Sequence, residues 1–348
     1  MSSIVDSLLQ LATSLLTCTN AGTQHLTVGR RQYRVERQLG TGGFSHVFLA
    51  SDADTGQQYA IKKMVCHSGT DALELAQREI DAGRRFVHPN IAPLIDSSVS
   101  EHAQGSAVHM VFPLYARGTL FDLTQHNAET GERLSEEFIV RTFAGVCRAV
   151  RYLHEYRAEQ SGQNTDSTGP VEYARGYAEV SQTDDEMAGG AVHGDIKLAN
   201  VMLRDDDSPV LVDFGSARGS HMQAHSRVQA LKIQDDAAER CSLPYRAPEL
   251  FDVQRGAMFD ARTDVWALGC LLFALAYNFT PFEDPAAGPG ASIVLAAVNA
   301  RYAAPQPDPY SPRLAQLVAF MLEPDPQKRP FIDQVVALSE SLYPEYSE

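Results

Sequence analysis

The pattern of apolar and polar residues predicts strands in the first third of the chain. Alternation of period two from Tyr33 to Leu39 is typical of a half-buried strand. Residues 44–50, 58–65 and 108–112 predict three more strands. Apolar residues recur at helical spacing between Leu73 and Val87, which predicts a helix that Pro89 ends.

Helical periodicity dominates the rest of the chain. A long amphipathic helix is predicted over residues 134–153, with Ser135 as its cap. A strongly apolar helix over residues 265–276 contains the only tryptophan, Trp266. Two very short strands and three further helices complete the pattern, at residues 201–203 and 210–212 and near 291–301, 311–323 and 332–342. The chain is therefore strand-rich first and helix-rich second.

Two segments do not follow this pattern. Residues 1–30 carry an apolar helical stripe with Cys18 just past its end. A helix beside an S-palmitoylated Cys18 would supply the two weak anchors that stable membrane attachment needs. Packing of that helix on the following domain, with Cys18 unmodified, is an equal alternative. Residues 155–191 hold eight acidic residues against two arginines and no sustained periodicity, which predicts an exposed, disordered acidic insertion.

Composition excludes several classes of protein. Asp and Glu outnumber Lys and Arg by 44 to 29, and the net charge of −15 has the wrong sign for a nucleic-acid binder. The five cysteines show no metal or disulfide spacing, which suits a reducing compartment. No uninterrupted apolar run reaches the ~18 residues of a membrane-spanning helix. The N-terminus lacks the basic start of a secretory signal.

A glycine-rich turn and a lysine suggest a phosphate-binding site. Residues 40–43 lie between two predicted strands, and glycines let a backbone approach phosphates and point its N–H groups at them. Ala60 and Lys62 share one face of the third strand, so Ala60 can lie against a flat base while Lys62 reaches phosphates. Glu79, in the next helix, can pair with Lys62, and Glu74 is the competing choice.

Four polar residues in the second half suit phosphoryl transfer. Asp195 can accept a proton from a hydroxyl nucleophile or orient it, and Lys197 can neutralise the transferring group. Asn200 and Asp213 offer the oxygen ligands that Mg²⁺ prefers. A Mg²⁺ ion there would bridge phosphate oxygens and absorb charge as the bond breaks.

The order of these motifs resembles that of eukaryotic protein kinases, across about residues 33–340. It runs from the glycine-rich loop through Ala-x-Lys, the helix Glu, Asp-x-Lys-x-x-Asn and Asp-Phe-Gly to Ala-Pro-Glu at residues 247–249. Residues 76–79, 88–91 and 241–249 are similar to the Numb-associated kinase family. Within that family, the chain most resembles the branch of the myristoylated and palmitoylated Golgi serine/threonine kinase.

The resemblance implies an α+β, bilobal protein kinase fold. A small β-rich lobe would cover residues 33–115, and a larger α-helical lobe residues 116–340. The implied activity is transfer of the ATP γ-phosphate to Ser or Thr hydroxyls of protein substrates, with ATP and Mg²⁺ as cofactors. The resemblance also implies peripheral association with the cytoplasmic side of Golgi, vacuolar or other endomembranes.

The resemblance also assigns roles to individual residues. Asp195 and Lys197 would be catalytic, and Asn200 and Asp213 would hold the metal. Glu249 would pair with Arg329, and Asp264 would anchor the catalytic loop; the alternative for each is an ordinary surface ion pair worth ~0–1 kcal/mol. The implied ATP-binding residues, which end with a hinge that holds adenine, are Leu39, Gly40, Thr41, Gly42, Gly43, Phe44, Ser45, Val47, Ala60, Lys62, Glu79, Phe112 and Tyr115.

Three positions depart from the family pattern. Ser45 takes the place of the third loop glycine. Gly194 replaces an arginine that receives a phosphorylated activation segment, so we predict a basal activity that does not depend on such phosphorylation. Loss of activity on phosphatase treatment would contradict this prediction. Ser2 stands where myristoylation requires glycine, so that modification is not expected.

Two other functions remain alternatives. A kinase-shaped scaffold would bind without transfer, but Lys62, Asp195, Asn200 and Asp213 are all present. A small-molecule phosphotransferase would share the two lobes, but the long segment 216–246 suits a peptide substrate.

Overall fold

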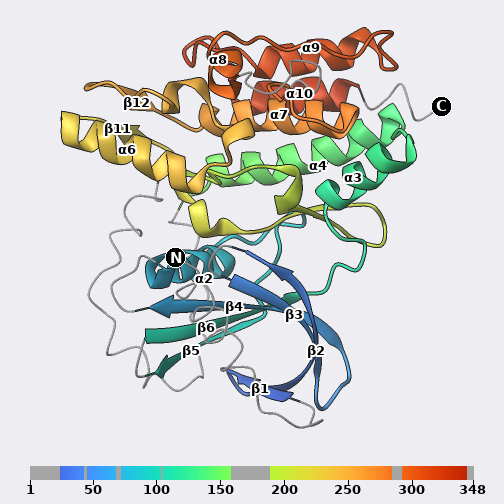
Figure 1. Ribbon diagram of the computed structural model, residues 1–348, viewed down its shortest axis with the longest axis vertical. Coiled ribbons are helices and arrows are strands. Elements are labelled where there is room, and N and C mark those ends of the chain that lie inside the picture. The colour runs from blue at the N-terminus through green and yellow to red at the C-terminus, as the bar shows by residue number, and fades with distance from the viewer. Residues whose placement is uncertain are drawn as a thin grey trace, which may run out of the picture.

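The protein consists of two lobes of different composition. The computed structural model describes residues 24–42, 45–67, 72–102, 105–157, 189–283 and 292–342. One lobe is a six-stranded sheet with helix α2 beside it, and the other is larger and mainly helical (Figure 1). The expected α+β, bilobal fold is therefore confirmed. The predictions for Cys18, Gly43, Phe44 and residues 158–188 of the insertion concern positions outside the described residues.

The sheet of the small lobe is antiparallel and has the strand order β1-β2-β3-β4-β6-β5. The elements of the small lobe are β1 (Gln24–Val28), β2 (Arg31–Thr41), β3 (Ser45–Asp52), β4 (Gln58–His67), α2 (Ala72–Arg85), β5 (Asp96–His102) and β6 (Gly105–Pro113). Strand β1 pairs with β2, so residues 24–28 belong to this sheet. Val28 is fully buried in one cluster with Tyr33, so apolar burial holds this strand on the sheet.

The two faces of this sheet bury different groups of side chains. Ile61 and Val111 are fully buried together on one face. Lys62 lies on the opposite face of β4, because successive side chains of a strand alternate. Helix α2 covers this second face through Ala76 and Ile80. The sheet and α2 therefore enclose Lys62 between them.

The large lobe is built around α4 and α7. Every residue of α7 from Arg262 to Ala276 is buried, including Trp266. Helix α4 begins after Ser135, whose Oγ accepts a hydrogen bond from the N–H of Phe138, as the sequence predicts. The elements of this lobe are α3 (Leu120–Thr130), α4 (Glu136–His154), β7 (Ala191–Val192), β8 (Val201–Leu203), β9 (Pro209–Leu211), β10 (Arg218–Gly219), β11 (Met222–Gln223), α6 (Arg227–Arg240), β12 (Met258–Phe259), α7 (Arg262–Tyr277), α8 (Ile293–Val298), α9 (Pro312–Met321) and α10 (Ile332–Ser341).

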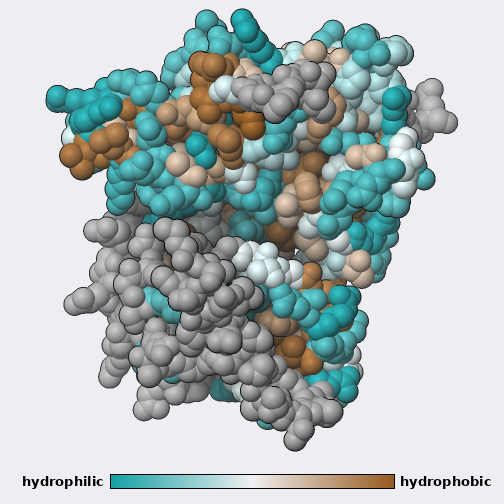
Figure 2. All heavy atoms as spheres, viewed as in Figure 1, coloured by the Kyte–Doolittle hydropathy of each residue, from teal (hydrophilic) through white to brown (hydrophobic). Residues whose placement is uncertain are grey.

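Some elements differ from the sequence prediction. Strand β5 and helices α3 and α6 are additional, and α8 is shorter than expected. Apolar side chains gather at the left edge of the large lobe, where α6 and β12 lie (Figure 2), and Val228, Leu231 and Met258 are exposed there. Over the described ranges, we find no helix with the length and apolarity needed to cross a membrane.

Candidate active site

The glycine-rich turn joins the ends of β2 and β3. Gly40 pairs with Val47, one residue before the end of β2. The N–H of Gly42 donates to the carbonyl oxygen of Ser45 at 2.7 Å, which closes the turn. Apart from its chain neighbours, no heavy atom of the described residues lies within 4 Å of the point that a Cβ on Gly40 would occupy. The space beside Gly40 is therefore open to a ligand, whereas a Cβ on Gly42 would lie 2.9 Å from Ser45 Oγ.

One face of the sheet presents the residues expected to contact a nucleotide. The register pairs Val47 with Lys62 across β3 and β4, and Ala60 with Phe112 across β4 and β6. Paired residues lie on the same face, and Ala60 is two residues from Lys62, so all four share that face. Ala60 and Phe112 are half-buried. Tyr115, just beyond β6, is half-buried too.

Lys62 connects the two lobes through ion pairs. Its Nζ lies 2.7 Å from Glu79 Oε2 on α2 and 2.9 Å from Asp213 Oδ1 of the large lobe. Burial disfavours the charged ammonium, but the two carboxylates outweigh burial and raise the pKa of Lys62. Glu74, the competing choice, instead pairs with Arg78 at 2.6 Å. Glu79 is therefore the partner of Lys62.

Asp213 is placed by an unusual backbone conformation. Its φ of 66° is in the left-handed region, and the 3-10 helix Phe214–Ser216 follows it directly. The ring of Phe214 packs 5.0 Å from His193 and 5.9 Å from Phe86, which follows α2. Burial opposes ionisation of Asp213, but the charge of Lys62 holds the pKa of that carboxyl below its usual range. The carboxylate is thus ionised and points toward the small lobe.

Asp195 is the centre of a polar network. Its Oδ2 accepts hydrogen bonds from Lys197 Nζ at 2.7 Å and from Asn200 Nδ2 at 3.2 Å. Its Oδ1 accepts a hydrogen bond from the N–H of Ser242 at 3.0 Å. Lys197 Nζ also donates to Ser242 Oγ at 2.9 Å. The carboxylate is therefore held in one orientation by groups from two segments.

The loop that carries Asp195 is anchored to the core by Asp264. The carboxylate of Asp264 accepts the N–H groups of His193 at 2.8 Å and Gly194 at 3.0 Å. His154 Nε2 lies 3.0 Å from the same carboxylate. Burial opposes ionisation, but His154 and the backbone hydrogen bonds hold the pKa of Asp264 below its usual range. This buried carboxylate on α7 therefore fixes the position of the loop relative to the core.

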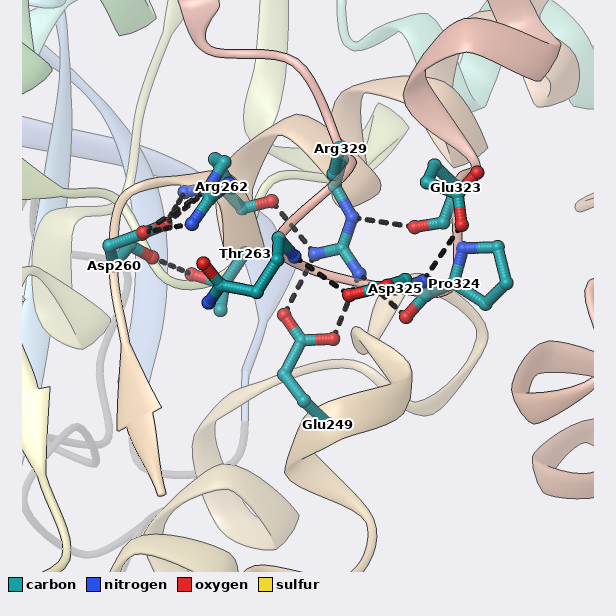
Figure 3. Close-up of polar contacts among 9 residues, drawn as sticks. Glu249, Asp260, Arg262, Thr263, Glu323, Pro324, Asp325 and Arg329 are labelled. Carbon is teal, nitrogen blue, oxygen red and sulfur yellow. Dashed lines mark hydrogen bonds and ion pairs between the residues drawn. The ribbon is translucent and has the colours of Figure 1, made fainter. Parts of the chain in front are cut away.

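Arg329 makes a second buried connection in the large lobe. Its guanidinium pairs with both oxygens of Glu249, at 2.7 and 2.9 Å (Figure 3). It also donates to the carbonyl oxygens of Arg262 and Glu323. The pairing was expected, but a surface ion pair is the wrong description, since the Arg329 side chain is 0% exposed.

Comparison of the sequence with models of known protein families agrees with this geometry. A model of the protein kinase domain matches residues 33–158 and 188–339. The chain belongs to the protein kinase family. The interruption of the match falls inside the expected acidic insertion 155–191.

This kinase is similar to curated proteins along nearly all of its length. It is 36% identical to serine/threonine-protein kinase 16 of Rattus norvegicus over 91% of this chain and 92% of that protein. It is 32% identical to serine/threonine-protein kinase ppk13 of Schizosaccharomyces pombe, over 87% of this chain and 88% of the relative. It is 28% identical to serine/threonine-protein kinase ENV7 of Saccharomyces cerevisiae, over 97% and 100%.

The polar network around Asp195 contains one residue to which the sequence assigns no role, Ser242. Ser242 contacts both Asp195 and Lys197, although the two segments are more than 40 residues apart. Its only signal in the sequence is its place in residues 241–249, which are similar to the kinase family. Contacts of this kind depend on the path of the intervening chain.

Proposed function

We propose that this kinase transfers the γ-phosphoryl group of ATP to Ser and Thr hydroxyls of protein substrates. The observation that carries the proposal is that two ion pairs, Lys62 with Asp213 and Lys197 with Asp195, lie close enough for the charge of Lys197 to act on Asp213. The names of the relatives, all serine/threonine-protein kinases, support the same substrate class.

The small lobe would hold the nucleotide. The half-buried face with Ala60 and Phe112 suits an apolar base, and Leu39, which is 39% exposed, lies just before the turn. Lys62 would grip the phosphates, because its ammonium stays charged beside two carboxylates. Glu79 would position Lys62 in this role.

Asn200 and Asp213 have the donor set for Mg²⁺. Asn200 Nδ2 donates a hydrogen bond to the backbone oxygen of Asp195, so the amide oxygen Oδ1 is not used in this contact. The Asp213 side chain is 45% exposed and ionised. Carboxylate and amide oxygens are ligands that Mg²⁺ accepts. An ion held by these two residues would offset the negative charge of the phosphates during transfer.

Asp195 would orient the substrate hydroxyl. Its two oxygens accept hydrogen bonds from three directions, so a hydroxyl donating to the carboxylate would meet a fixed acceptor. Lys197, beside Asp195, would offset the negative charge on the transferring phosphoryl group. Ser242 would keep Lys197 in place.

The test is phosphate transfer with matched variants. The kinase is incubated with radiolabelled ATP, Mg²⁺ and dephosphorylated casein, and the product is hydrolysed to identify the phosphoamino acid. We expect phosphoserine and phosphothreonine. Asp195→Asn should lower the rate by about 10²–10⁴-fold, the range for loss of a positioned acid–base group. The exposed Asp205, in the turn after β8, gives the matched control Asp205→Asn, which should retain the rate.

The same assay decides between the alternatives. Equal incorporation by the kinase and Asp195→Asn would contradict the transfer proposal and favour a scaffold. Transfer to small hydroxyl compounds but not to casein would favour a small-molecule phosphotransferase.

Membrane attachment through Cys18 stays a proposal from the sequence alone. Labelling of cells with an alkynyl palmitate should mark the kinase, and Cys18→Ser should remove the label. A label that survives this substitution would assign the acyl chain elsewhere.

A further inference from the structure

The sheet of the small lobe has a second apolar face, on the side away from α2. We call it the outer face. It carries Ile61, and the register pairs Ile61 with Phe48 of β3 and with Val111 of β6. Ala107 lies on the same face, because it is four residues from Val111 on β6. At most 8% of each of these four residues is exposed, so the outer face is shielded from water.

The described elements account for the cover over only part of the outer face. Leu26 and Val28 of β1 pack in one cluster with Ile61 and Val111. Phe48 is not part of this cluster, and the one described helix of the small lobe, α2, packs on the opposite face. An apolar sheet face is buried by a second layer packed against it. The shielding of Phe48 therefore requires a further segment of the chain.

Residues 1–23 have the composition that such a layer needs. Apolar residues at positions 4, 8, 11 and 15, with those at 5, 9, 12 and 16 beside them, form one stripe at helical spacing. Asp6 is the only charged side chain in residues 1–23. A helix over residues 4–16 would be ~20 Å long, which is the width of the four strands β3, β4, β6 and β5 at ~4.8 Å each.

The chain also joins the sheet where this segment can reach the outer face. Strand β1 begins at Gln24, which pairs with Val35 of β2. Val35 in turn pairs with Ala50, which is buried in one cluster with Ile61. Residues 17–23 can extend for ~23 Å, at ~3.3 Å per residue, so residues 4–16 can reach Phe48. The acidic insertion 155–191 is joined to the large lobe instead, between α4 and β7, and its eight acidic residues do not suit an apolar face.

We propose that the outer face is the docking site of residues 4–16 of this chain. The apolar stripe would cover Phe48 and Ala107, beside the part of the face that β1 covers. Lys63 lies on the same face, two residues from Ile61, and burial lowers its pKa. Residues 1–23 contain no Lys or Arg, so docking brings no like-charged side chain to Lys63. While the stripe is docked it is not available to a membrane, and an acyl chain on Cys18 alone would give only marginal attachment.

A photo-crosslinking residue on the outer face identifies the segment that covers it. In the full chain, p-benzoylphenylalanine replaces Lys63, and the peptides joined by irradiation are identified by mass spectrometry. We expect a peptide that contains residues 1–23 of the same molecule. The matched control places the probe at Gln58, on the opposite face of β4, and should not capture this peptide. Capture of residues 155–191, or of a second molecule, would overturn the proposal.

A reciprocal probe keeps the test decisive if a bulky residue at Lys63 itself hinders docking. Here p-benzoylphenylalanine replaces Leu9, within the apolar stripe, and should join peptides from β3, β4 or β6. Placed at Gln10, on the opposite side of the same helical pattern, the probe should not join them. Attachment from Leu9 to the large lobe, or no attachment from either Leu9 or Lys63, would overturn the proposal. Cross-linking needs no catalysis, so failure of the proposed activity leaves this measurement unaffected.

Substitutions in the stripe show whether its apolar side chains hold it on the sheet. Leu8→Ser with Leu11→Ser should lower the yield of the cross-link from Lys63 about tenfold, because two leucines lose their burial. Gln10→Ala with Ser14→Ala, on the opposite side of the pattern, should leave the yield unchanged. Thermal unfolding checks that each variant is folded. An undiminished yield in the folded Leu8→Ser, Leu11→Ser variant would overturn the proposal.

Discussion

Lys62 is a residue at which the two lobes make direct ionic contact. Its side chain is 14% exposed, and its ammonium is shared by Glu79 from the small lobe and Asp213 from the large lobe. Sharing between two carboxylates keeps the charge on Lys62 despite its burial. The position of the ammonium therefore depends on α2 as well as on β4.

Glu79→Gln should lower the rate of phosphate transfer while the protein remains folded. The amide keeps the size of the side chain but removes the charge that orients Lys62. Charge-assisted hydrogen bonds contribute about 1.5–3 kcal/mol, so kcat/KM should fall by about 10- to 100-fold. Asp81→Asn on the same helix is the matched control, because Asp81 contacts Gln77 and not Lys62. Equal rates for Glu79→Gln and Asp81→Asn would refute the positioning role.

His88 should make stability depend on pH in a mildly acidic range. Its Nδ1 accepts a hydrogen bond from the N–H of Asn90 at 3.0 Å, which a protonated ring could not do. Burial first, and then the charges of Arg148 and Arg151, lower the pKa of His88. The unfolded state therefore binds more protons below the ordinary histidine pKa of about 6.5, and stability falls as the pH decreases through this range.

Urea unfolding at about pH 8 and about pH 5.5 measures this effect on either side of the ordinary histidine pKa. His88→Asn should lose less stability on acidification than the unsubstituted kinase, since Asn can still accept from the N–H two residues on. The exposed His25 supplies the control His25→Asn, which should have the same pH dependence of unfolding as the unsubstituted kinase. An identical pH dependence in His88→Asn would exclude this histidine as the cause.

At the scale of elements, strongly patterned segments were predictable and weakly patterned ones were not. Helices α4 and α7 and strand β4 have apolar residues that meet a core, so their periodicity is visible in the sequence. Helix α6 buries only Ala230 and Ala237, which leaves no apolar stripe to recognise. Strand β5 is a sheet edge with mostly polar residues.

The candidate site was predictable to the extent that its residues belong to ordered motifs. Lys62, Glu79, Asp195 and Asp213 follow one another in a recognisable order, and the fold brings Lys62, Glu79 and Asp213 into direct contact. The contact of Ser242 with Asp195 depends on how residues 216–242 cross the large lobe. Sequence spacing carries no information about that path.

Gly194→Ala should destabilise the loop that carries Asp195. Gly194 has φ of 81°, and a Cβ would meet Arg218 and the backbone of Ser216 at less than 3 Å. Gly56 has φ of 72° with no atom within 4 Å of its Cβ position, so Gly56→Ala measures the backbone strain alone. Gly194→Ala should cost about 1–3 kcal/mol more, the usual range for overpacking. Urea unfolding of the two variants gives the difference in their free energies of unfolding. Equal losses would show that the Arg218 side chain moves aside at no measurable cost.

At the scale of the whole molecule, charge is distributed unevenly. The acidic excess of −15 includes the insertion 155–191, which holds eight acidic residues and two arginines. A local exception is the cavity between α2 and α6, which is lined by Arg78, Arg218, Lys232 and Arg240. Since exposed charges more than about 10 Å apart are largely screened at ordinary salt, the local groups decide how phosphates bind.

The pair of Glu249 and Arg329 connects distant parts of the large lobe. Arg329 follows α9, Glu249 lies in the segment after α6, and Arg262 begins α7 (Figure 3). Because the Arg329 side chain is fully buried, its charge has no access to water if Glu249 is lost. The pair therefore contributes to the integrity of the lobe in a way that an exposed pair does not.

Glu249→Ala should therefore lower the free energy of unfolding by about 3–5 kcal/mol, the cost of leaving one charge of a buried pair without its partner. Lys328 is the neighbour of Arg329 in sequence, but it is 73% exposed where it pairs with Asp325. Lys328→Ala should cost about 0–1 kcal/mol, as exposed pairs do. Chemical unfolding of both variants measures the contrast. If Glu249→Ala cost no more than Lys328→Ala, the carbonyl oxygens of Arg262 and Glu323 would be sufficient to hold Arg329 in the interior.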